Sequence, residues 1–488
     1  MKTDMTQQYP ISQSPTARSR TRRGLRATML LLLCLPLLTA CKGWFDISPK
    51  SELKADDLLR TEQGFRDALM GCYALMADAD LYGASLTYTY ADVLAGYYPT
   101  AAGTLHSFRY AYAYDYANST EEARTTRIWK DLYNVIANLN NLLQSIDQQR
   151  EVFADGNYAL IRGEALGLRA YLYLDLLRLY APAPADGGLG QPAVPWVDTF
   201  TNAMQQRSTT GQVLDHIVSD LQEARLLLAP VDPYGPRHAD YDLSALTGLR
   251  QGREYRMNYY AATALLARTC LYRSAEGDQP LAAAMAQEVI QSGLFPLISS
   301  EDITSADQNG FTQENIFALE YRDLKEKQID SYFYAPNTSS RMLALNAAVM
   351  GKLFPAGINA DYRRQYWLSE NGSNQLVCKY DHSNRIPLLK VGEMYLIATE
   401  TAPTAADQAT WYNALRYHRG LPDEDLQGQD LPTVLRHEYA REFLAEGQLF
   451  FACKRMGYDR TPIMETVLAD PRAVYTLPLP TDNTYFAP

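Results

Sequence analysis

Two long amphipathic segments, 121–146 and 158–180, most constrain the fold that this chain can adopt. In both segments large apolar residues recur every three or four positions, which is the spacing of one face of an α-helix. A short link joins the segments, so the two helices are expected to pack against each other. Gly163 and Gly167 on the second segment would let a partner helix approach closely. The chain is therefore predicted to be mainly α-helical.

Further amphipathic segments predict helices along most of the chain. The expected helices open at Thr61 and cover 206–228, 257–273, 281–292, 385–398, 406–419 and 431–456. Paired helices of this size, with alanine at crowded positions, are typical of tetratricopeptide (TPR) repeats, although the period of about 34 residues is irregular here. The scaffold is expected to span 61–293 and to contain a long Tyr-rich loop, 81–117. Residues 294–384 predict an irregular, loop-rich second lobe that binds ligand, and 385–488 predict C-terminal helices with an extended tail.

The N-terminal segment has the pattern of a secretion signal. Basic residues precede a short apolar run, 28–40, which is too short to span the hydrocarbon core of about 30 Å. The run ends in Leu38-Thr39-Ala40-Cys41, which resembles the lipobox of bacterial lipoproteins. Residues 1–40 are then a signal peptide, Cys41 carries the lipid, and 41–60 form a tether. An ordinary signal peptide that ends beside a cysteine is the alternative.

The charge balance excludes nucleic acid as a partner. The first 40 residues hold six of the 45 basic residues and one of the 56 acidic ones, so the remaining chain has a net charge of −16. Such a surface repels polyanions, and no cluster of Lys and Arg is present to bind them. The widely spaced Cys72, Cys270, Cys378 and Cys453 predict packed thiols rather than a metal cluster, and a disulfide between them stays open. No cofactor is expected.

The sequence contains none of the common catalytic motifs, neither G-x-S-x-G, nor H-E-x-x-H, nor a phosphate-binding G-x-x-x-x-G-K. One set of carboxylates remains, Glu438, Glu442 and Glu446, which lie four residues apart. Their helical spacing of about 5–6 Å is close to the separation in a retaining glycosidase. Neighbours on one helical stripe point the same way, however, and do not flank a sugar. The carboxylates are interleaved with Arg436, Arg441, Lys454 and Arg455, so structural ion pairing is the favoured interpretation, and a surface glycosidase is the alternative.

Tyrosine supplies the binding candidates, because the chain has 35 Tyr against 14 Phe. Rings that carry a hydroxyl favour wet aromatic surfaces over a dry core. Tyr97 and Tyr98 lie between Gly96 and Pro99 and are expected to be exposed. The alternating Tyr110, Tyr112, Tyr114 and Tyr116 would share one face of an extended chain, either to bind ligand or to cover the helical core. The first group of candidates is Tyr88, Asp92, Tyr97, Tyr98, Arg109, Tyr110 and Tyr112, and the second group, in the irregular lobe, is Tyr332, Tyr334 and Arg341 with Tyr321 and Asn337 nearby.

Five motifs in the same order resemble those of the SusD/RagB family of outer-membrane nutrient-binding lipoproteins. They are Cys41-Lys42-Gly43-Trp44-Phe45-Asp46-Ile47-Ser48-Pro49, the W-x-x-x-Y-x-x-I-x-x-x-N helix from Trp129 to Asn140, Gly163-Glu164-Ala165 through Arg169-Ala170-Tyr171, the stretch 385–400, and 438–457 with Glu446-Gly447-Gln448. One departure is that Gln448-Leu449-Phe450-Phe451-Ala452 stands where relatives often have Arg-Trp-Phe-Asp. The chain's end is also shorter.

The resemblance implies a TPR-containing helical scaffold with an irregular ligand-binding lobe. It also implies a partner, a SusC-like TonB-dependent β-barrel transporter, over which the lipoprotein acts as a lid that delivers oligosaccharides or peptides. The protein would lie on the outer membrane through Cys41, facing the exterior, and would bind without catalysis. A surface glycosidase and a purely structural TPR scaffold are the alternatives. Ligand residues of this family lie in variable loops, so the candidates above correspond to it only by region.

Overall fold

The computed structural model describes residues 58–201, 203, 205–304, 310–336, 339–464 and 467–481. Cys41, the signal peptide and most of the tether lie outside the described residues.

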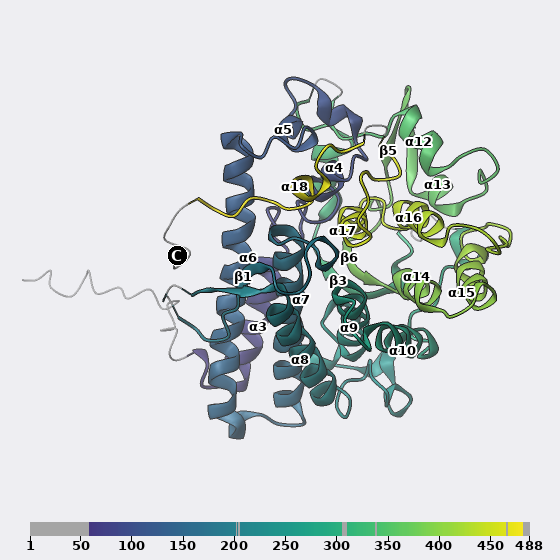
Figure 1. Cartoon of the computed structure of the whole chain (residues 1–488). Helices are drawn as coiled ribbons and strands as arrows, with labels where there is room; N and C mark the ends of the chain where they lie inside the picture. Colours follow the sequence, from purple (N-terminus) through teal and green to yellow (C-terminus); the bar gives the residue numbers. More distant parts are fainter. Residues whose placement is uncertain are drawn as a thin grey trace, which may run out of the picture. The chain divides into compact units, whose positions relative to one another are not determined.

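The helices are α3 (Glu62–Met76), α4 (Tyr90–Leu94), α5 (Arg109–Tyr112), α6 (Ser119–Ile146), α7 (Asn157–Tyr180), α8 (Thr210–Leu228), α9 (Tyr259–Arg273), α10 (Asp278–Gln291), α11 (Asp330–Tyr332), α12 (Ala347–Leu353), α13 (Tyr362–Tyr366), α14 (Val391–Thr401), α15 (Ala405–Tyr417), α16 (Leu431–Glu442), α17 (Gln448–Arg455) and α18 (Pro471–Val474) (Figure 1).

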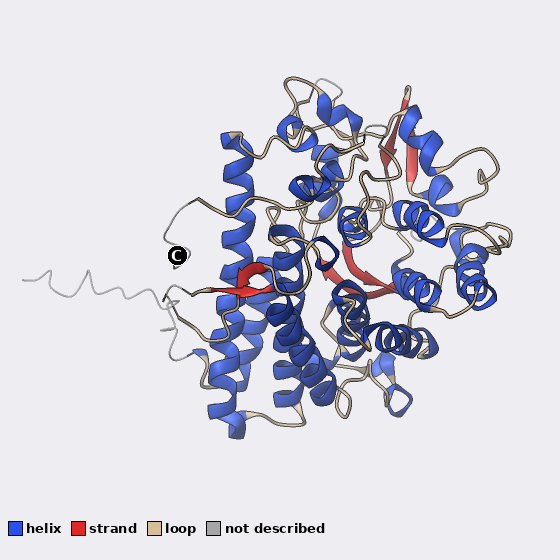
Figure 2. Ribbon diagram, viewed as in Figure 1, coloured by secondary structure: helices blue, strands red, loops and turns tan. Residues whose placement is uncertain are grey.

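The strands are few and short (Figure 2). They are β1 (Pro192–Pro195), β2 (Arg207–Thr209), β3 (Asn315–Glu320), β4 (Leu368–Asn371), β5 (Asn374–Val377) and β6 (Arg385–Lys390). In the described part of the chain they form three antiparallel pairs, β1 with β2, β3 with β6, and β4 with β5. The fold is therefore mainly α, as predicted.

The helices stack in succession, and this stack forms the TPR-like scaffold. α7 packs on α8, α8 on α9, α9 on α10, α10 on α14 and α14 on α15, while α6 lies against α7 and α3 against α6. The predicted role of the small residues on α7 is confirmed. A methyl group on Gly163 would lie 2.7 Å from Leu228 Cγ, and one on Gly167 would lie 2.4 Å from Met257 Cγ. Only glycine lets α8 and the start of α9 approach α7 this closely.

Side-chain caps explain where several helices begin. Thr61 accepts the N–H of Gly64 and opens α3. Thr209 forms a capping box with Gln212 at the start of α8, because each side chain bonds to the other's backbone N–H. The three residues before α8, which were predicted to be part of the helix, form β2 instead and pair with β1.

Two of the helix predictions for the C-terminal part were wrong. Residues 385–390 form β6, which pairs with β3 across a buried ladder, and the helix begins only at Val391. The predicted helix 431–456 breaks into α16 and α17 at an elbow, 443–447. The elbow has left-handed backbone at Ala445 (φ 61°) and Gly447 (φ 73°). A methyl group on Gly447 would lie 2.4 Å from the carbonyl oxygen of Leu86, so glycine is required there.

The four cysteines predicted to be packed thiols are free. Cys72, Cys270 and Cys453 are buried, and Cys378 is half-buried. Burial raises the pKa of Cys72 to about 12, which keeps it a neutral, unreactive thiol. No helix within the described residues combines the length and the apolar character that crossing a membrane needs.

Candidate ligand-binding surface

The structure brings together the two groups of candidate residues that lie more than 200 positions apart in the sequence. The N–H of Ser107 donates to the carbonyl oxygen of Ser340 at 2.7 Å, and the N–H of Ala344 donates to Thr100 Oγ1 at 3.1 Å. The ring of Phe108 also packs against that of Tyr332, with 6.3 Å between the centroids. We call the outer residues of this contact, Arg109, Tyr110, Tyr332, Tyr334 and Arg341, the aromatic junction.

A buried layer of rings supports the aromatic junction. Tyr88 is fully buried, and its ring centroid lies 6.3 Å from that of Tyr332 and 5.5 Å from that of Tyr380. Tyr98 packs against Phe333 from the same side, at 5.8 Å. The pairs adopt tilted and edge-on geometries, as aromatic pairs prefer. The short helix α11 and the residues after it are therefore fixed on a rigid base.

Tyr334 is the most exposed tyrosine of the aromatic junction, with 36% of its surface accessible. Its hydroxyl donates to Asp381 Oδ2 at 2.5 Å, and Lys325 Nζ lies 4.1 Å from its ring centroid. Burial and the neighbouring carboxylate of Asp381 raise the pKa of Tyr334, so the phenol stays protonated. The ring is thereby held in one orientation at the surface, where it can stack on a ligand.

Arg109 and Tyr110 on α5 form a second fixed pair. The guanidinium carbon of Arg109 lies 4.1 Å above the ring centroid of Tyr110, and Arg109 donates to the Tyr110 hydroxyl at 2.7 Å. Both side chains are half-buried, and Arg341 is exposed. The aromatic junction thus combines rings with cationic donors.

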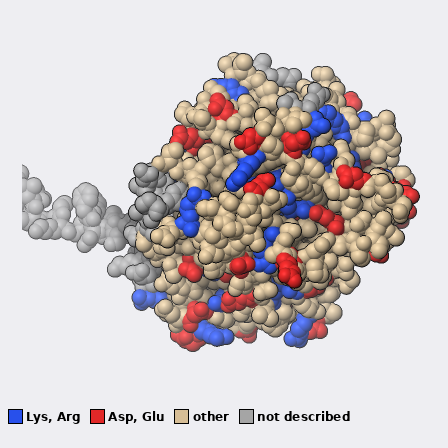
Figure 3. All heavy atoms as spheres, in the orientation of Figure 1, with Lys and Arg blue, Asp and Glu red and all other residues tan. Residues whose placement is uncertain are grey.

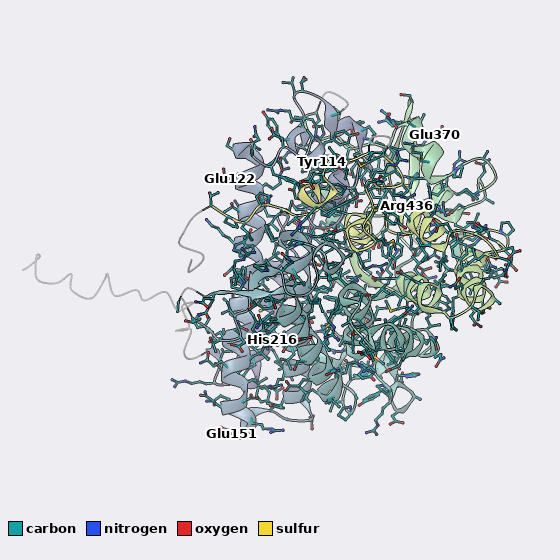
Figure 4. All side chains as sticks on the ribbon, viewed as in Figure 1. Tyr114, Glu122, Glu151, His216, Glu370 and Arg436 are labelled. Atoms are coloured by element: carbon teal, nitrogen blue, oxygen red, sulfur yellow. The ribbon has the colours of Figure 1, made fainter. Side chains whose placement is uncertain are left out.

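Tyr112 lies on the same short helix, α5, but lines a cavity away from the aromatic junction. It lines a cavity of about 670 Å³ between α5, α12 and the C-terminal segment. The other lining side chains are mostly apolar, and the polar ones are partly engaged, since Asn346 caps α12 and Asp470 caps α18. Figure 4 shows Tyr114, another lining residue, beside α18. This cavity is separate from the five residues of the aromatic junction.

The expected exposure of Tyr97 and Tyr98 is wrong. Both are fully buried, and buried acceptors satisfy their hydroxyls: Tyr97 donates to the carbonyl oxygen of the distant Ala440 at 2.6 Å, and Tyr98 to Asp92 Oδ2, six residues away, at 3.4 Å. Asp92 is also buried and accepts the N–H of Gly447 at 2.9 Å. Tyr88 donates to the carbonyl oxygen of Gly83. These four residues support the fold from inside and are inaccessible to ligand in this structure.

The extended face of alternating tyrosines is also absent. Residues 109–112 form α5, and Tyr114 follows in a left-handed conformation with φ 56°. Tyr114 donates to the carbonyl oxygen of Leu94 and Tyr116 to that of Val474, each at 2.8 Å. Tyr114 and Tyr116 therefore connect neighbouring segments of the fold. For these two residues the alternative interpretation, that the tyrosines cover the helical core, holds. Tyr110 alone of the four belongs to the aromatic junction.

The structural interpretation of Glu438, Glu442 and Glu446 is confirmed. All three are buried and paired with cations: Glu438 with Arg363 at 2.5 Å and Arg441 at 2.6 Å, Glu442 with Arg419 at 2.7 Å, and Glu446 with Lys379 at 2.6 Å. Burial alone would raise the pKa of Glu438, but the two guanidiniums outweigh it and lower that pKa to about 2. The carboxylates do not flank an open cleft as a glycosidase pair would.

Most of the cations in this network come from outside the helix that was predicted to supply them. Of the four cations named from the sequence only Arg441 joins it. Arg455 pairs with Glu400 at 2.7 Å, Arg436 lies 4.3 Å from the ring of Tyr458, and Lys454 donates to backbone carbonyls at the end of α7. Acidic and basic side chains are also interspersed over the face shown in Figure 3.

Sequence reasoning missed His106, which joins the two halves of the aromatic junction. Its Nδ1 accepts the N–H of Phe108 at 3.2 Å, which leaves Nε2 to donate to the carbonyl oxygen of Met342 at 3.1 Å. Burial lowers the pKa of His106 and favours this neutral form. Lys325 and Asp381, which hold Tyr334, were also missed. No local pattern marks His106 or Asp381, because Met342 lies 236 positions from His106 and Tyr334 lies 47 positions from Asp381.

Comparison with known proteins identifies relatives of one family. A model of the SusD-like family described as starch-binding and associating with the outer membrane matches residues 43–237. A SusD-like protein of Formosa agariphila is 25% identical over 263 residues, which cover 50% of this chain and 45% of that protein. A second from the same organism is 24% identical over 201 residues, 40% of this chain and 36% of that protein. The matches therefore span less than half the length of these relatives.

Solved structures share the fold over most of the chain. A SusD superfamily protein of Bacteroides vulgatus has a TM-score of 0.67 at 20% identity and covers 86% of this chain and 96% of its own. One from Bacteroides thetaiotaomicron has a TM-score of 0.64 at 21% identity with the same coverage. A SusD-like carbohydrate-binding protein of Bacteroides vulgatus has a TM-score of 0.61 at 19% identity and covers 81% of this chain and 83% of its own. The chain is therefore similar to SusD-like proteins in its family-model match over residues 43–237, in these relatives and in its fold.

Proposed function

We propose that this protein is a cell-surface lipoprotein that binds oligosaccharides at the aromatic junction and delivers them to a TonB-dependent outer-membrane transporter. The observation that carries the binding site is the convergence of the segments 100–110 and 332–344, which places Tyr332, Tyr334, Tyr110 and two arginines on one rigid base. Aromatic rings stack on the apolar faces of sugars, and the surrounding polar groups can hydrogen-bond the hydroxyls. The match to the SusD-like family model and the structural likeness to a carbohydrate-binding protein support the ligand class.

The remaining parts of the proposal follow from the family and from the leader sequence. Cys41 would carry the lipid that holds the protein on the outer membrane, and a SusC-like barrel would take the ligand onward. Binding would occur without cleavage, since the buried carboxylates serve as partners for cations. Labelled palmitate incorporated into the chain but not into its Cys41→Ala variant tests the anchor. Copurification of a barrel partner from membranes tests delivery.

Ligand binding is tested with a glycan and peptide array on the chain from residue 42 onward, followed by calorimetry. Tyr334→Ala is expected to weaken glycan binding at least about tenfold, or about 1.4 kcal/mol, with little change in melting temperature. Tyr417→Ala is the matched control, because Tyr417 is 72% exposed on α15 and lies outside the aromatic junction. Unchanged affinity in Tyr334→Ala would place the site elsewhere. Exclusive binding of peptides, or release of cleaved sugar, would contradict the proposal.

A further inference from the structure

Two arginines of the aromatic junction carry charge that the protein does not neutralise. Arg109 donates to the Tyr110 hydroxyl and, at 3.5 Å, to the carbonyl oxygen of His106, both of which are neutral. Arg341 is exposed, and among the described residues only its backbone N–H donates a hydrogen bond, to Ser339 Oγ at 3.2 Å. Within the described residues neither guanidinium lies within 4.0 Å of a carboxylate, whereas most arginines of the buried core are paired with one.

Several carboxylates around the aromatic junction are, in contrast, already engaged. Asp381 accepts from Tyr334, and Asp330 pairs with Lys325. Asp80 pairs with Arg127 at 2.6 Å, and Glu121 with Arg124 at 3.0 Å. Lys325 also lies 3.9 Å from Asp381, so it serves two carboxylates, and Asp115 is exposed just after α5. Arg109 and Arg341 remain the guanidiniums of the aromatic junction that no described carboxylate contacts, although the whole chain carries a formal net charge of −11.

The positive groups lie where a ligand stacked on the rings would meet them. The backbone bond between Ser107 and Ser340 places Arg109 and Arg341 on the two sides of the contact between the segments. Burial and the charge of Asp80 raise the pKa of Tyr332, while the charges of Arg341 and Arg124 act in the opposite direction. The ring of Tyr332 packs against the rings of Phe108 and Tyr88.

The chemistry of these groups selects among glycans. A sugar hydroxyl can donate and accept, so a site for neutral sugars gains from free carboxylates and amides. A guanidinium only donates, and its planar fork fits a carboxylate or sulfate with two parallel hydrogen bonds. Resting on the function proposed above, we infer that the aromatic junction selects an anionic oligosaccharide, whose acidic groups pair with Arg109 and Arg341 while its rings stack on Tyr332 and Tyr334.

Calorimetry with hexasaccharides of three kinds tests this inference on the chain from residue 42 onward. An oligogalacturonate supplies carboxylates, a sulfated carrageenan fragment supplies sulfates, and maltohexaose and cellohexaose are neutral. We expect one charged hexamer to bind at least about tenfold more tightly than either neutral one, and this preference to shrink between about 50 mM and about 300 mM NaCl. Which charged hexamer binds identifies the acidic group.

Arginine variants assign the preference to this surface. Arg109→Gln with Arg341→Gln is expected to lower affinity for the charged hexamer at least about tenfold and to remove its salt dependence. Arg109→Lys with Arg341→Lys keeps the positive charge but loses the planar guanidinium that forms two parallel hydrogen bonds, so it should retain part of the preference for the charged hexamer. This variant also tests the inference if the glutamine variant folds poorly. Arg150→Gln is the control, because Arg150 stacks on Tyr158 beside Glu151, at the far end of α6 from the aromatic junction (Figure 4).

The outcomes separate this inference from the proposed function. Equal or tighter binding of a neutral hexamer overturns the anionic preference but leaves a glycan-binding protein. A charge preference that survives Arg109→Gln with Arg341→Gln overturns the assignment to these residues. Failure to bind any of the hexamers, with binding of peptides instead, overturns both.

Discussion

Replacing Tyr97 and Tyr98 by alanine distinguishes a packed core from an exposed binding loop. The position of the pair between Gly96 and Pro99 suggested exposed rings, whose loss would weaken binding and leave stability unchanged. Both rings are fully buried in the structure. We therefore expect Tyr97→Ala with Tyr98→Ala to unfold the protein rather than to affect binding alone.

The magnitude follows from the contacts. Truncating a buried aromatic ring costs about 3–5 kcal/mol. The two ring centroids lie 6.1 Å apart, so the truncations share one cavity and their costs do not simply add. We expect the pair to lose about 5 kcal/mol or more, a large part of the total of about 5–15 kcal/mol that is usual for a protein. Tyr97→Phe keeps the ring and leaves the Ala440 carbonyl oxygen without its donor, at a cost of about 1–3 kcal/mol.

Urea denaturation of the chain from residue 42 onward, followed by circular dichroism, measures these costs. The double variant is expected to be unfolded or recovered in low yield, and Tyr97→Phe to shift the midpoint by an amount that can be quantified. Tyr417→Ala is the control, because its ring is 72% exposed and its loss should change the free energy of unfolding by no more than about 0.5 kcal/mol. A double variant with wild-type stability and weakened ligand binding would refute the packing argument.

Three further predictions concern the buried charges and the α16–α17 elbow. Arg363→Met removes a cation shared by three buried carboxylates, leaves Asp361 without a charged partner and should cost about 3–5 kcal/mol by urea denaturation, whereas Arg364→Met, half-buried on the same helix and without a carboxylate partner among the described residues, should cost less. Because the pKa of Glu438 falls from the ordinary 4.5 to about 2 on folding, its contribution to stability is complete above pH 4.5 and should be lost as the pH falls from 4.5 to 2. The difference in the free energy of unfolding between wild type and Glu438→Gln, measured by urea denaturation, should therefore be largest above pH 4.5 and should shrink toward pH 2. Gly447→Ala should destabilise more than Gly457→Ala by thermal denaturation, because both have positive φ but only the first methyl meets a carbonyl oxygen. Equal losses in either matched pair of variants would contradict the contacts invoked.

The helical scaffold could be predicted because its signal is local. Segments such as 121–146 repeat apolar residues with the period of a helix, and threonine or asparagine caps mark several starts. The helix predictions failed where the sequence shows no periodic pattern. Residues 386–389 form a continuous apolar run that is buried in β6, and such a run has no period that separates a strand from a buried helix. The break at 443–447 depends on Asp92 and Leu86, which approach from far along the chain.

The candidate surface was predicted in its two parts but not in its members. Both the Tyr-rich segment and the region of Tyr332, Tyr334 and Arg341 were marked by composition, and the structure joins them. Burial of individual rings could not be predicted, because the carbonyl that accepts from Tyr97 is 343 positions away. The hydroxyl that suggested a wet surface serves equally well as a buried donor once such an acceptor is present.

A crystal structure of the chain from residue 42 onward, soaked with the tightest-binding hexasaccharide, tests the central claim most directly. The account predicts sugar density stacked against Tyr334 and Tyr332, with an acidic substituent between Arg109 and Arg341. Sugar density confined to the apolar cavity beside Tyr112, or to any other surface, would contradict it.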